Sequence, residues 1–312
     1  MAQWSLQVSD PAAVYHQPVL TEEIAARAAG ARRVVDATLG GGGHASRFKA
    51  AGAELLGIDR DPEAIAAARA HLGTAGVRYL EAPYASAEAL DAVAEFAPDF
   101  ILLDLGVSSR QLDDEARGFS FRPGAPLDMR MSRQGATAAD LLNRGSEAEL
   151  RRIFADYGDE RQAGRLAREL LRRRATQPFV VSDHLVNAIR AVLGPRSGPG
   201  DFARLFQALR IAVNEELPGL ERALPAFRDA LVPGGQLAVI SYHSGEDRIV
   251  KHAFREWSRA CICPPKAPVC TCRGRPLGRL DPKQPIRPTE TETATNPRAR
   301  SATLRIFRKA ES

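Results

Sequence analysis

The chain has 312 residues, enough to bury a full hydrophobic core and more than most single domains contain. Hydrophobic residues make up 44% of it and charged residues 26%, which is ordinary for a globular protein. No apolar run approaches the ~20 residues that a membrane span needs. Residues 1–10 also lack the basic and apolar regions of a secretion signal, so we expect a cytoplasmic protein without a membrane partner.

The net charge is +5, and basic residues are concentrated toward the C-terminal end. From Arg273 to Ser312, ten Lys or Arg stand against four Asp or Glu, with prolines between them. Such a segment can follow a phosphate backbone. Composition alone slightly favours a solvated tail, because many basic proteins bind no nucleic acid.

The residues before 106 alternate between strand and helix patterns. We expect strands at 34–37, 54–58, 77–80 and 100–105, and helices at 44–51, 61–71 and 85–96. Strands that alternate with helices at this spacing predict right-handed crossovers and an α/β fold with a parallel, doubly wound sheet.

The pattern changes at residue 111, where a loop rich in Gly, Pro and Arg precedes a helical, strand-poor stretch at 137–193. We therefore expect a helical insertion at 111–200 within a domain that is formed by 1–110 and 201–312.

After a flexible break at 194–200, an amphipathic helix is expected to run to 231, with interruptions at Pro218 and Pro225. The sheet pattern then resumes, with strands expected at 236–241 and 302–307 and irregular chain at 261–300.

A run of four glycines, Gly40–Gly43, follows the first predicted strand and opens the next helix. Glycines accept positive φ and let the backbone approach a ligand closely, and the helix N-terminus adds oriented N–H donors. Asp59 ends the second strand, where a carboxylate can accept hydrogen bonds from two ribose hydroxyls. These residues predict a cofactor site. Because Gly40, Gly42 and Ala45 also fit the G-x-G-x-x-A pattern, NAD remains open at this point.

Two further features favour S-adenosylmethionine. Asp36, near the end of the first strand, can face the amino-acid part of that ligand. The turn at 233–235, Pro-Gly-Gly before a strand, is typical of methyltransferase sheets, where it precedes the fifth strand.

The fourth strand ends at Asp104, and Gly106, Ser108 and Ser109 follow on the same loop. In doubly wound sheets, chemistry gathers outside these strand ends. Methyl transfer to an aromatic amine needs mainly in-line positioning, helped by hydrogen-bond acceptors for the amine N–H groups. We therefore predict catalytic roles for Asp104 and Ser108; a strand-capping Asp and a turn Ser are the structural alternative.

The four cysteines, Cys261, Cys263, Cys270 and Cys272, form a C-x-C-x6-C-x-C pattern. Disulfides are not expected in a cytoplasmic protein, and four thiolates match the ligand count of tetrahedral zinc. Because C-x-C is tighter than the usual C-x2-C, the sequence favours reduced, unliganded thiols over a zinc-bound loop. We assign no metal to the catalytic site.

Nine unusual stretches lie in order along nearly the whole chain, at 15–20, 36–44, 59–62, 102–112, 118–131, 157–161, 206–214, 240–251 and 296–304. Together they resemble the MraW (RsmH) family of bacterial small-subunit ribosomal RNA cytosine-N(4)-methyltransferases. The resemblance implies a Rossmann-like S-adenosylmethionine-dependent methyltransferase sheet with an inserted helical subdomain. It also implies a substrate: one cytidine in the decoding region, in naked RNA or in the assembled small subunit, that is methylated on its exocyclic amine.

By position, the resemblance implies that seven residues contact S-adenosylmethionine: Gly42, Gly43, His44, Asp59, Tyr84, Asp104 and Gln111. Tyr84 stands where the family usually has Phe and should still stack on adenine. His243, after the fifth strand, is a further candidate for the catalytic pocket, with a structural hydrogen bond as the alternative. Arg110 and Gly245 depart from the family's usual Pro and Leu, which puts the local loop geometry in doubt.

RNA contacts are expected outside the cofactor motif. A cytidine in folded RNA must be unstacked to present its amine, and Phe119 or Phe121 could supply a stacking ring; loop anchors packed into the insertion are an equal alternative. Phosphate contacts are expected from the basic C-terminal segment and from arginines of the insertion, namely Arg151, Arg152, Arg172, Arg173 and Arg174.

Two other functions fit part of the sequence. An NAD-dependent oxidoreductase would explain the glycine turn and Asp59 but not the motifs of the second half. An assembly factor that binds the cofactor and touches the ribosome without methylating it would explain those motifs, although the intact loop at 104–109 argues against it.

Overall fold

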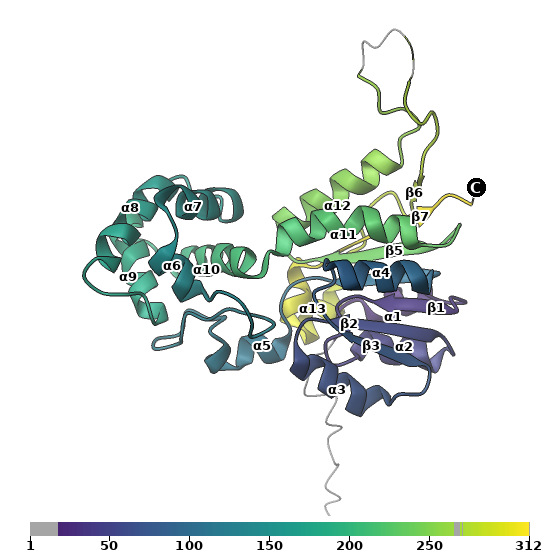
Figure 1. Ribbon diagram of the computed structural model, residues 1–312, viewed down its shortest axis with the longest axis horizontal. Coiled ribbons are helices and arrows are strands. Elements are labelled where there is room, and N and C mark those ends of the chain that lie inside the picture. Colours follow the sequence, from purple (N-terminus) through teal and green to yellow (C-terminus); the bar gives the residue numbers. More distant parts are fainter. Residues whose placement is uncertain (1–17, 265–268, 270, 312) are drawn as a thin grey trace, which may run out of the picture. The chain divides into compact units, whose positions relative to one another are not determined.

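The computed structural model describes residues 18–264, 269 and 271–311 (Figure 1). These residues form two compact units. The first, the sheet unit, takes the described residues up to Gly106 and those from Gly219 onward, and the second, the helical unit, is Val107–Pro218. Within the described part of the chain, no helix is both long and apolar enough to cross a membrane.

The sheet unit is built on seven strands in the order β3-β2-β1-β4-β5-β7-β6. Five of them are parallel: β1 Arg33–Asp36, β2 Glu54–Asp59, β3 Val77–Glu81, β4 Phe100–Asp104 and β5 Gln236–Ser241. β7, Thr303–Lys309, pairs antiparallel with β5, and β6, Gly278–Leu280, pairs antiparallel with β7. The predicted α/β fold with a doubly wound parallel sheet is confirmed. The strand order reverses between β1 and β4, which is where sheets of this type bind ligands.

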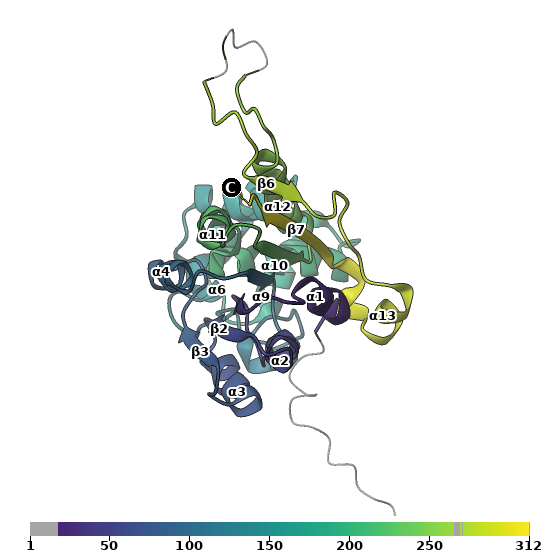
Figure 2. The same ribbon diagram turned by 90° about the vertical axis from the view of Figure 1, so that its right-hand side faces the viewer.

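Helices cover both faces of this sheet, because successive side chains of a strand point to opposite faces. Val34 of β1 belongs to one core and Val35 to the other. The first core includes residues of α1 Thr21–Arg27, α2 Gly43–Ala50 and α3 Pro62–Leu72; the second includes residues of α4 Ala87–Phe96, α11 Glu216–Ala230 and α12 Ser244–Trp257. Figure 2 shows helices of both layers beside the strands.

The chain before β5 differs from the single, proline-interrupted helix expected there. Two helices form, α10 Pro199–Asn214 and α11, and the break is at Glu215, whose φ of 50° is left-handed. Pro218 lies in the first turn of α11, where an N–H has no acceptor within the helix. Because α11 also continues through Pro225, the predicted interruptions at the two prolines are wrong.

The C-terminal part holds more regular structure than expected. The range predicted as irregular contains β6, the short helix α13 Glu290–Thr295 and the 3-10 turn Pro297–Ser301. Since β6 and β7 are sheet strands, much of the basic C-terminal segment is part of the fold rather than a solvated tail.

The helical unit begins with α5 Ser109–Asp113 and the 3-10 turn Glu115–Arg117. Its other helices are α6 Ala138–Arg144, α7 Glu147–Arg152, the π-helical turn Ile153–Tyr157, α8 Ala163–Arg174, α9 Ser182–Leu193 and α10. One core joins them, and α10 contributes Phe202, Leu205 and Phe206 to it. The unit therefore reaches Pro218, beyond the expected boundary at 200, because the apolar face of α10 is buried among the other helices of the unit.

Candidate active site

Three carboxylates lie at the carboxyl ends of neighbouring parallel strands. Asp36 ends β1, Asp59 ends β2 and Asp104 ends β4. Because β1 lies between β2 and β4, the three residues share one edge of the sheet, at the point where the strand order reverses. Their charges act on one another, since both Asp59 and Asp104 raise the pKa of Asp36. We call these three residues the carboxylate edge.

The glycine loop, Gly40–Gly43, is hydrogen-bonded to Asp59 of the carboxylate edge. The N–H of Gly40 donates to Asp59 Oδ2 at 2.8 Å, and the N–H of Asp61 donates to Asp59 Oδ1 at 2.8 Å. A carboxylate oxygen has two acceptor sites. Asp59 therefore keeps the capacity to accept hydrogen bonds from two hydroxyl groups of a ligand.

The start of α2 requires glycine for two reasons. Gly42, which precedes the helix, has a φ of 82°, a left-handed conformation that other residues adopt only with strain. A Cβ on Gly42 would also lie 2.9 Å from Leu72 Cδ1, and one on Gly43 would lie 2.6 Å from Pro18 Cγ. Among the described residues no side chain caps this end of α2, so its first N–H groups can bind a ligand.

Three side chains surround Asp104. Its backbone N–H donates to Thr38 Oγ1 at 2.7 Å, and Tyr242 Oη donates to Asp104 Oδ1 at 2.8 Å. His44 Nε2 lies 3.6 Å from Asp104 Oδ2. Burial, reinforced by the charge of Asp104, raises the pKa of Tyr242 well above its usual value, so Tyr242 stays protonated and remains a donor at neutral pH.

Tyr242 is not among the residues predicted from the sequence. It directly follows β5, the strand beside β4. That position is the signal that could have identified it, because residues after neighbouring parallel strands meet at the same edge. Tyr242 is a positioning residue for Asp104.

The electrostatics of the carboxylate edge indicate which ligand it can hold. Burial raises the pKa of Asp36 to about 7 and that of Asp59 to about 6. The largest electrostatic effect that opposes this rise at Asp36 comes from His44, whose Nε2 is buried without a hydrogen-bond partner in the part of the chain that is described. A cationic ligand would relieve the repulsion among the carboxylates. S-adenosylmethionine carries a sulfonium and an ammonium group, so it fits this edge.

Tyr84, expected to stack on adenine, lies in the loop that follows β3. It is half-buried, and its ring centroid lies 6.5 Å from that of Phe227 on α11. β3 pairs with β2, so this loop begins at the same edge of the sheet as Asp59. The stacking role stays a prediction.

His243 precedes α12 and lies close to a carboxylate of that helix. Its Nε2 lies 3.2 Å from Glu246 Oε1, and Glu246 Oε2 accepts the N–H of Tyr242 at 2.8 Å. Glu246 is buried, and the hydrogen bond that it accepts from the N–H of Tyr242 anchors the turn from β5 into α12. His243 Nε2 is itself buried without a hydrogen-bond partner among the described residues, so the structural hydrogen bond is not formed there and the catalytic role of His243 stays a prediction.

Ser108 and Gln111 belong to the helical unit and hold each other. The N–H of Gln111 donates to Ser108 Oγ at 3.2 Å, and the N–H of Ser108 donates to Gln111 Oε1 at 3.1 Å. This reciprocal pair is a capping box at the start of α5. Both side chains thus have a local structural role, and their predicted roles in catalysis and cofactor binding stay predictions.

The aromatic loop residues pack into the core of the helical unit. The ring centroid of Phe121 lies 6.0 Å from that of Phe202 and 6.0 Å from that of Phe206, with edge-on geometry. Phe119 is also half-buried against this core. These contacts favour loop anchors over a ring that stacks on the target base.

The arginines predicted to bind phosphate differ in their surroundings. Arg172 and Arg173 both bind Glu169, and these contacts lower the pKa of Glu169 to about 2. Arg174 donates to two backbone carbonyl oxygens near the end of α6, so it stabilises a helix end. The pair at 151–152 is exposed on α7 and has no ion pair among the described residues, although Arg152 donates to Tyr157 Oη at 3.2 Å. The exposed pair is the part of this set best placed to contact RNA.

Two arginines of the C-terminal segment are also engaged within the sheet unit. Arg305 donates to both carboxylate oxygens of Asp247, at 2.7 and 3.0 Å. Arg308 donates to Asp281 at 3.1 Å. These ion pairs join β7 to its surroundings and reduce the charge that this segment can offer to a phosphate backbone.

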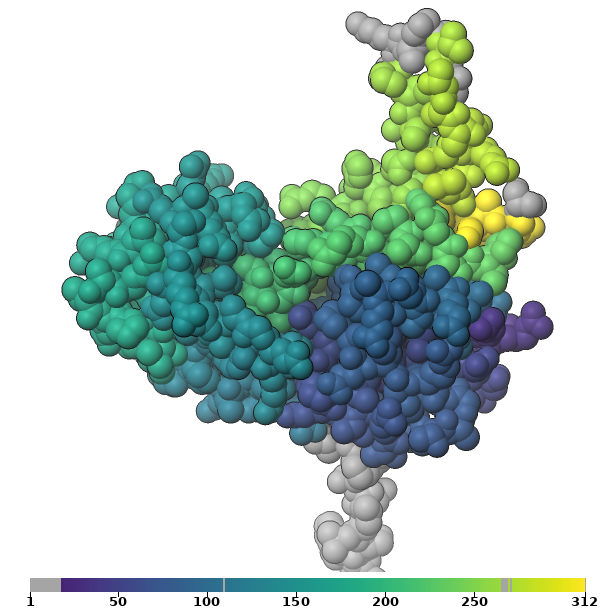
Figure 3. Space-filling view, in the orientation of Figure 1, coloured from purple at the N-terminus to yellow at the C-terminus, as the bar shows by residue number. Residues whose placement is uncertain are grey.

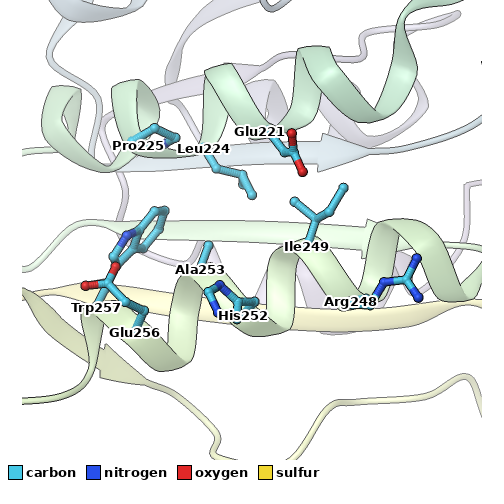
Figure 4. Close-up of a pocket in the computed structure, with 9 residues that line it drawn as sticks. All are labelled: Glu221, Leu224, Pro225, Arg248, Ile249, His252, Ala253, Glu256 and Trp257. Atoms are coloured by element: carbon cyan, nitrogen blue, oxygen red, sulfur yellow. The ribbon is translucent and has the colours of Figure 1, made fainter. Parts of the chain in front are cut away.

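A groove between α11 and α12 shares no residue with the predicted site (Figure 4). Leu224 and Ile249 point into it, and charged side chains lie at its rim. Its lining consists of Glu221, Leu224, Pro225, Arg248, Ile249, His252, Ala253, Glu256 and Trp257.

Comparison with known proteins identifies the family. The model of the MraW methylase family matches residues 13–310. A protein of Gemmatimonas aurantiaca named ribosomal RNA small subunit methyltransferase H is 56% identical, and the match covers 95% of this chain and 96% of that protein. Proteins of the same name from Heliobacterium modesticaldum and Rubrobacter xylanophilus are 48% and 47% identical, over 88% and 96% of this chain and 91% and 98% of their own lengths. This chain, with its carboxylate edge and its glycine loop, therefore belongs to the MraW methylase family.

Proposed function

We propose that this chain transfers a methyl group from S-adenosylmethionine to the exocyclic N(4) amine of a cytidine in the decoding region of small-subunit ribosomal RNA. The observation that carries the proposal is the carboxylate edge beside a glycine loop, which suits a cationic nucleoside cofactor. Membership of the family supports the reaction, and the names of the relatives support the class of RNA. Because the substrate is ribosomal RNA, we also place the reaction in the cytoplasm.

The sheet unit supplies the groups that would hold the cofactor. When bound, S-adenosylmethionine supplies an electrophilic methyl group on its sulfonium. Asp59 accepts hydrogen bonds from the ribose hydroxyls, and Gly42 and Gly43 let the first turn of α2 approach the ligand. Asp36 and Asp104 provide negative charge for the ammonium and sulfonium groups.

Asp104 has a second role at the amine that is methylated. Its carboxylate accepts a hydrogen bond from an N–H of the cytidine and so localises the nitrogen lone pair for attack. Tyr242 and Thr38 hold Asp104 in place for this task. The methylated nitrogen is briefly cationic and releases its proton readily, so the reaction needs positioning more than a strong base.

The RNA would be bound largely through its phosphates, with the target base turned out of its stack. The exposed pair at 151–152 supports a phosphate contact on the helical unit. Replacing Arg151 and Arg152 together by Gln should weaken RNA binding and reduce the steepness of its salt dependence. Unchanged salt dependence would remove the pair from the RNA interface.

The experiment that tests the function measures methyl transfer from labelled S-adenosylmethionine to unmodified small subunits and, separately, to protein-free small-subunit RNA. Nucleosides from the digested RNA are then identified by mass spectrometry. We expect labelled N(4)-methylcytidine, and the comparison of the two substrates shows which form of the RNA is used. Asp104→Ala should lower the rate by about a hundredfold or more, whereas Asp91→Asn, an exposed change on α4, should leave it unchanged.

Three outcomes would contradict the proposal in different ways. Binding of S-adenosylmethionine by calorimetry without any labelled nucleoside would favour the assembly factor. Binding of NADH in place of S-adenosylmethionine would favour the oxidoreductase. Label in a nucleoside other than N(4)-methylcytidine would keep the methyltransferase and overturn its target atom.

A further inference from the structure

Three cysteines converge in the sheet unit, in the segment between α12 and β6. The Sγ atoms of Cys261, Cys263 and Cys272 all lie within 4.8 Å of one another. Cys261 Sγ and Cys272 Sγ are 3.8 Å apart. Cys270, the fourth cysteine of the predicted cluster, lies outside the described residues.

These distances suit one metal ion bound by three thiolates. Zinc binds thiolate sulfur at about 2.3 Å, so two ligands of a tetrahedral site are separated by about 3.8 Å. A disulfide would need sulfurs about 2.05 Å apart, and the distance between Cys261 and Cys272 is nearly twice that. The backbone N–H of Ile262 also donates to Cys272 Sγ at 3.4 Å, which favours the thiolate form that a metal requires.

The segment that carries the cysteines has no hydrophobic core of its own. Among its described residues from 259 to 277 none is buried, and none belongs to a helix or a strand. Figures 1 and 3 show this segment extending away from the sheet and helices of the sheet unit. A chain that buries so little surface cannot offset the entropy lost on ordering, so a cross-link near its far end would stabilise the observed arrangement.

The base of the segment is anchored without the cysteines. Arg273 donates to Glu256 Oε1 at 2.9 Å, and the N–H of Leu277 donates to the carbonyl oxygen of Trp257 at 2.8 Å. These contacts bring the two arms together where they leave the sheet unit. The cysteines lie beyond this anchor, where thiolates bound to one metal ion would join the two arms.

We propose that Cys261, Cys263 and Cys272 bind one Zn²⁺ ion, which orders the segment between α12 and β6. The site is structural, because it shares no residue with the carboxylate edge and its ligands lie on a segment that protrudes from the fold. The sequence alone favours unliganded thiols; the convergence of three sulfurs from both arms is what favours the metal. Metal binding would release thiol protons and join 261–263 to Cys272.

The test measures metal in the full chain, purified under reducing conditions without a metal-affinity step. We expect about one equivalent of zinc per chain after incubation with zinc chloride and desalting. Replacement by Co²⁺ should give the thiolate-to-cobalt charge-transfer band and the strong visible bands of a tetrahedral sulfur site. Cys261→Ser and Cys272→Ser should each lose most of the metal, whereas Thr271→Ser, an exposed change beside the last cysteine, should keep it.

The outcomes separate the alternatives cleanly. Less than about a tenth of an equivalent of zinc in the wild-type chain, or a cobalt spectrum without thiolate bands, overturns the proposal. Equal metal loss in Thr271→Ser and the cysteine variants overturns it as well. Because the cysteines lie outside the core clusters, the variants should keep the circular dichroism of the wild type. Should one of them unfold, the cobalt spectrum of the wild-type chain still decides, and none of these readouts depends on methyl transfer.

Discussion

Replacing Asp36 by Asn would measure how much the ionised carboxylate of Asp36 lowers the free energy of unfolding. Asp36 is only 2% exposed, and burial raises its pKa from 3.8 to about 7. Asn has nearly the same shape without the charge, and its Oδ1 can still accept the N–H of Thr38, which lies 3.2 Å from Asp36 Oδ1. The substitution therefore removes a titrating group and largely preserves the packing.

The sign of the effect follows from which state binds the proton more tightly. The pKa of Asp36 is higher in the folded chain, so its stabilising contribution is complete below about pH 4 and is lost as the pH rises through about 7. A pKa raised from 3.8 to about 7 corresponds to about 4 kcal/mol at most. Asp59, whose pKa is raised to about 6, adds to the same trend. The wild type should lose free energy of unfolding across this window, and Asp36→Asn should lose less of it.

Urea unfolding at pH values from about 5 to about 8.5 gives the free energy of unfolding at each pH. A Trp4→Phe background leaves Trp257 as the only tryptophan, and Trp257 is buried in the sheet unit. Asp91→Asn, an exposed control, should follow the wild type. If the free energies of unfolding of Asp36→Asn and the wild type differ by the same amount at every pH, the reasoning is refuted, whatever the size of that difference.

Three further changes test the geometry of the site and of the helical unit. Tyr242→Phe removes the 2.8 Å hydrogen bond to Asp104, which is worth about 1.5–3 kcal/mol because its acceptor is charged. Single-turnover methyl transfer should therefore slow by about ten- to a hundredfold. An unchanged rate would show that Tyr242 does not position Asp104 for the reaction. Gly42→Ala and Gly30→Ala both place a side chain at positive φ, which costs about 1–2 kcal/mol each. Only at Gly42 would the new Cβ crowd a leucine, so the melting temperature of Gly42→Ala should fall further than that of Gly30→Ala. Equal falls in melting temperature would contradict the clash. Phe121→Leu should destabilise the helical unit by about 1 kcal/mol in urea unfolding, with methyl transfer nearly intact; a large loss of turnover without a loss of stability would return Phe121 to the base-stacking role.

Local pattern is enough to place much of the site. Asp36, Asp59 and Asp104 each close a short apolar run, and a parallel sheet brings the ends of such runs to one edge. The ranges of α2, α3 and α4 follow from their periodicity and from the residues at their ends, and each lies within two residues of its expected bounds. The glycine turn is equally local, because positive φ at Gly42 is a property of one residue's backbone.

The break between α10 and α11 shows where local pattern misleads. Proline predicts an interruption, but in the first turn of a helix its missing N–H costs nothing, and the chain instead turns at Glu215. The apolar face of α10 could equally have covered the sheet; its burial among the helices of the helical unit is a property of the folded chain.

The sequence by itself determined the family, the alternation of strands and helices and the residues at the ends of three strands. Only the tertiary structure decided that Tyr242 holds Asp104, 138 residues away, that Arg174 donates to carbonyl oxygens near the end of α6, and that sulfurs from two arms converge. The physical reason is that these contacts depend on which strands pair and which helix faces meet. Local periodicity reports which face of an element is apolar, but it does not report what that face or that strand end will meet.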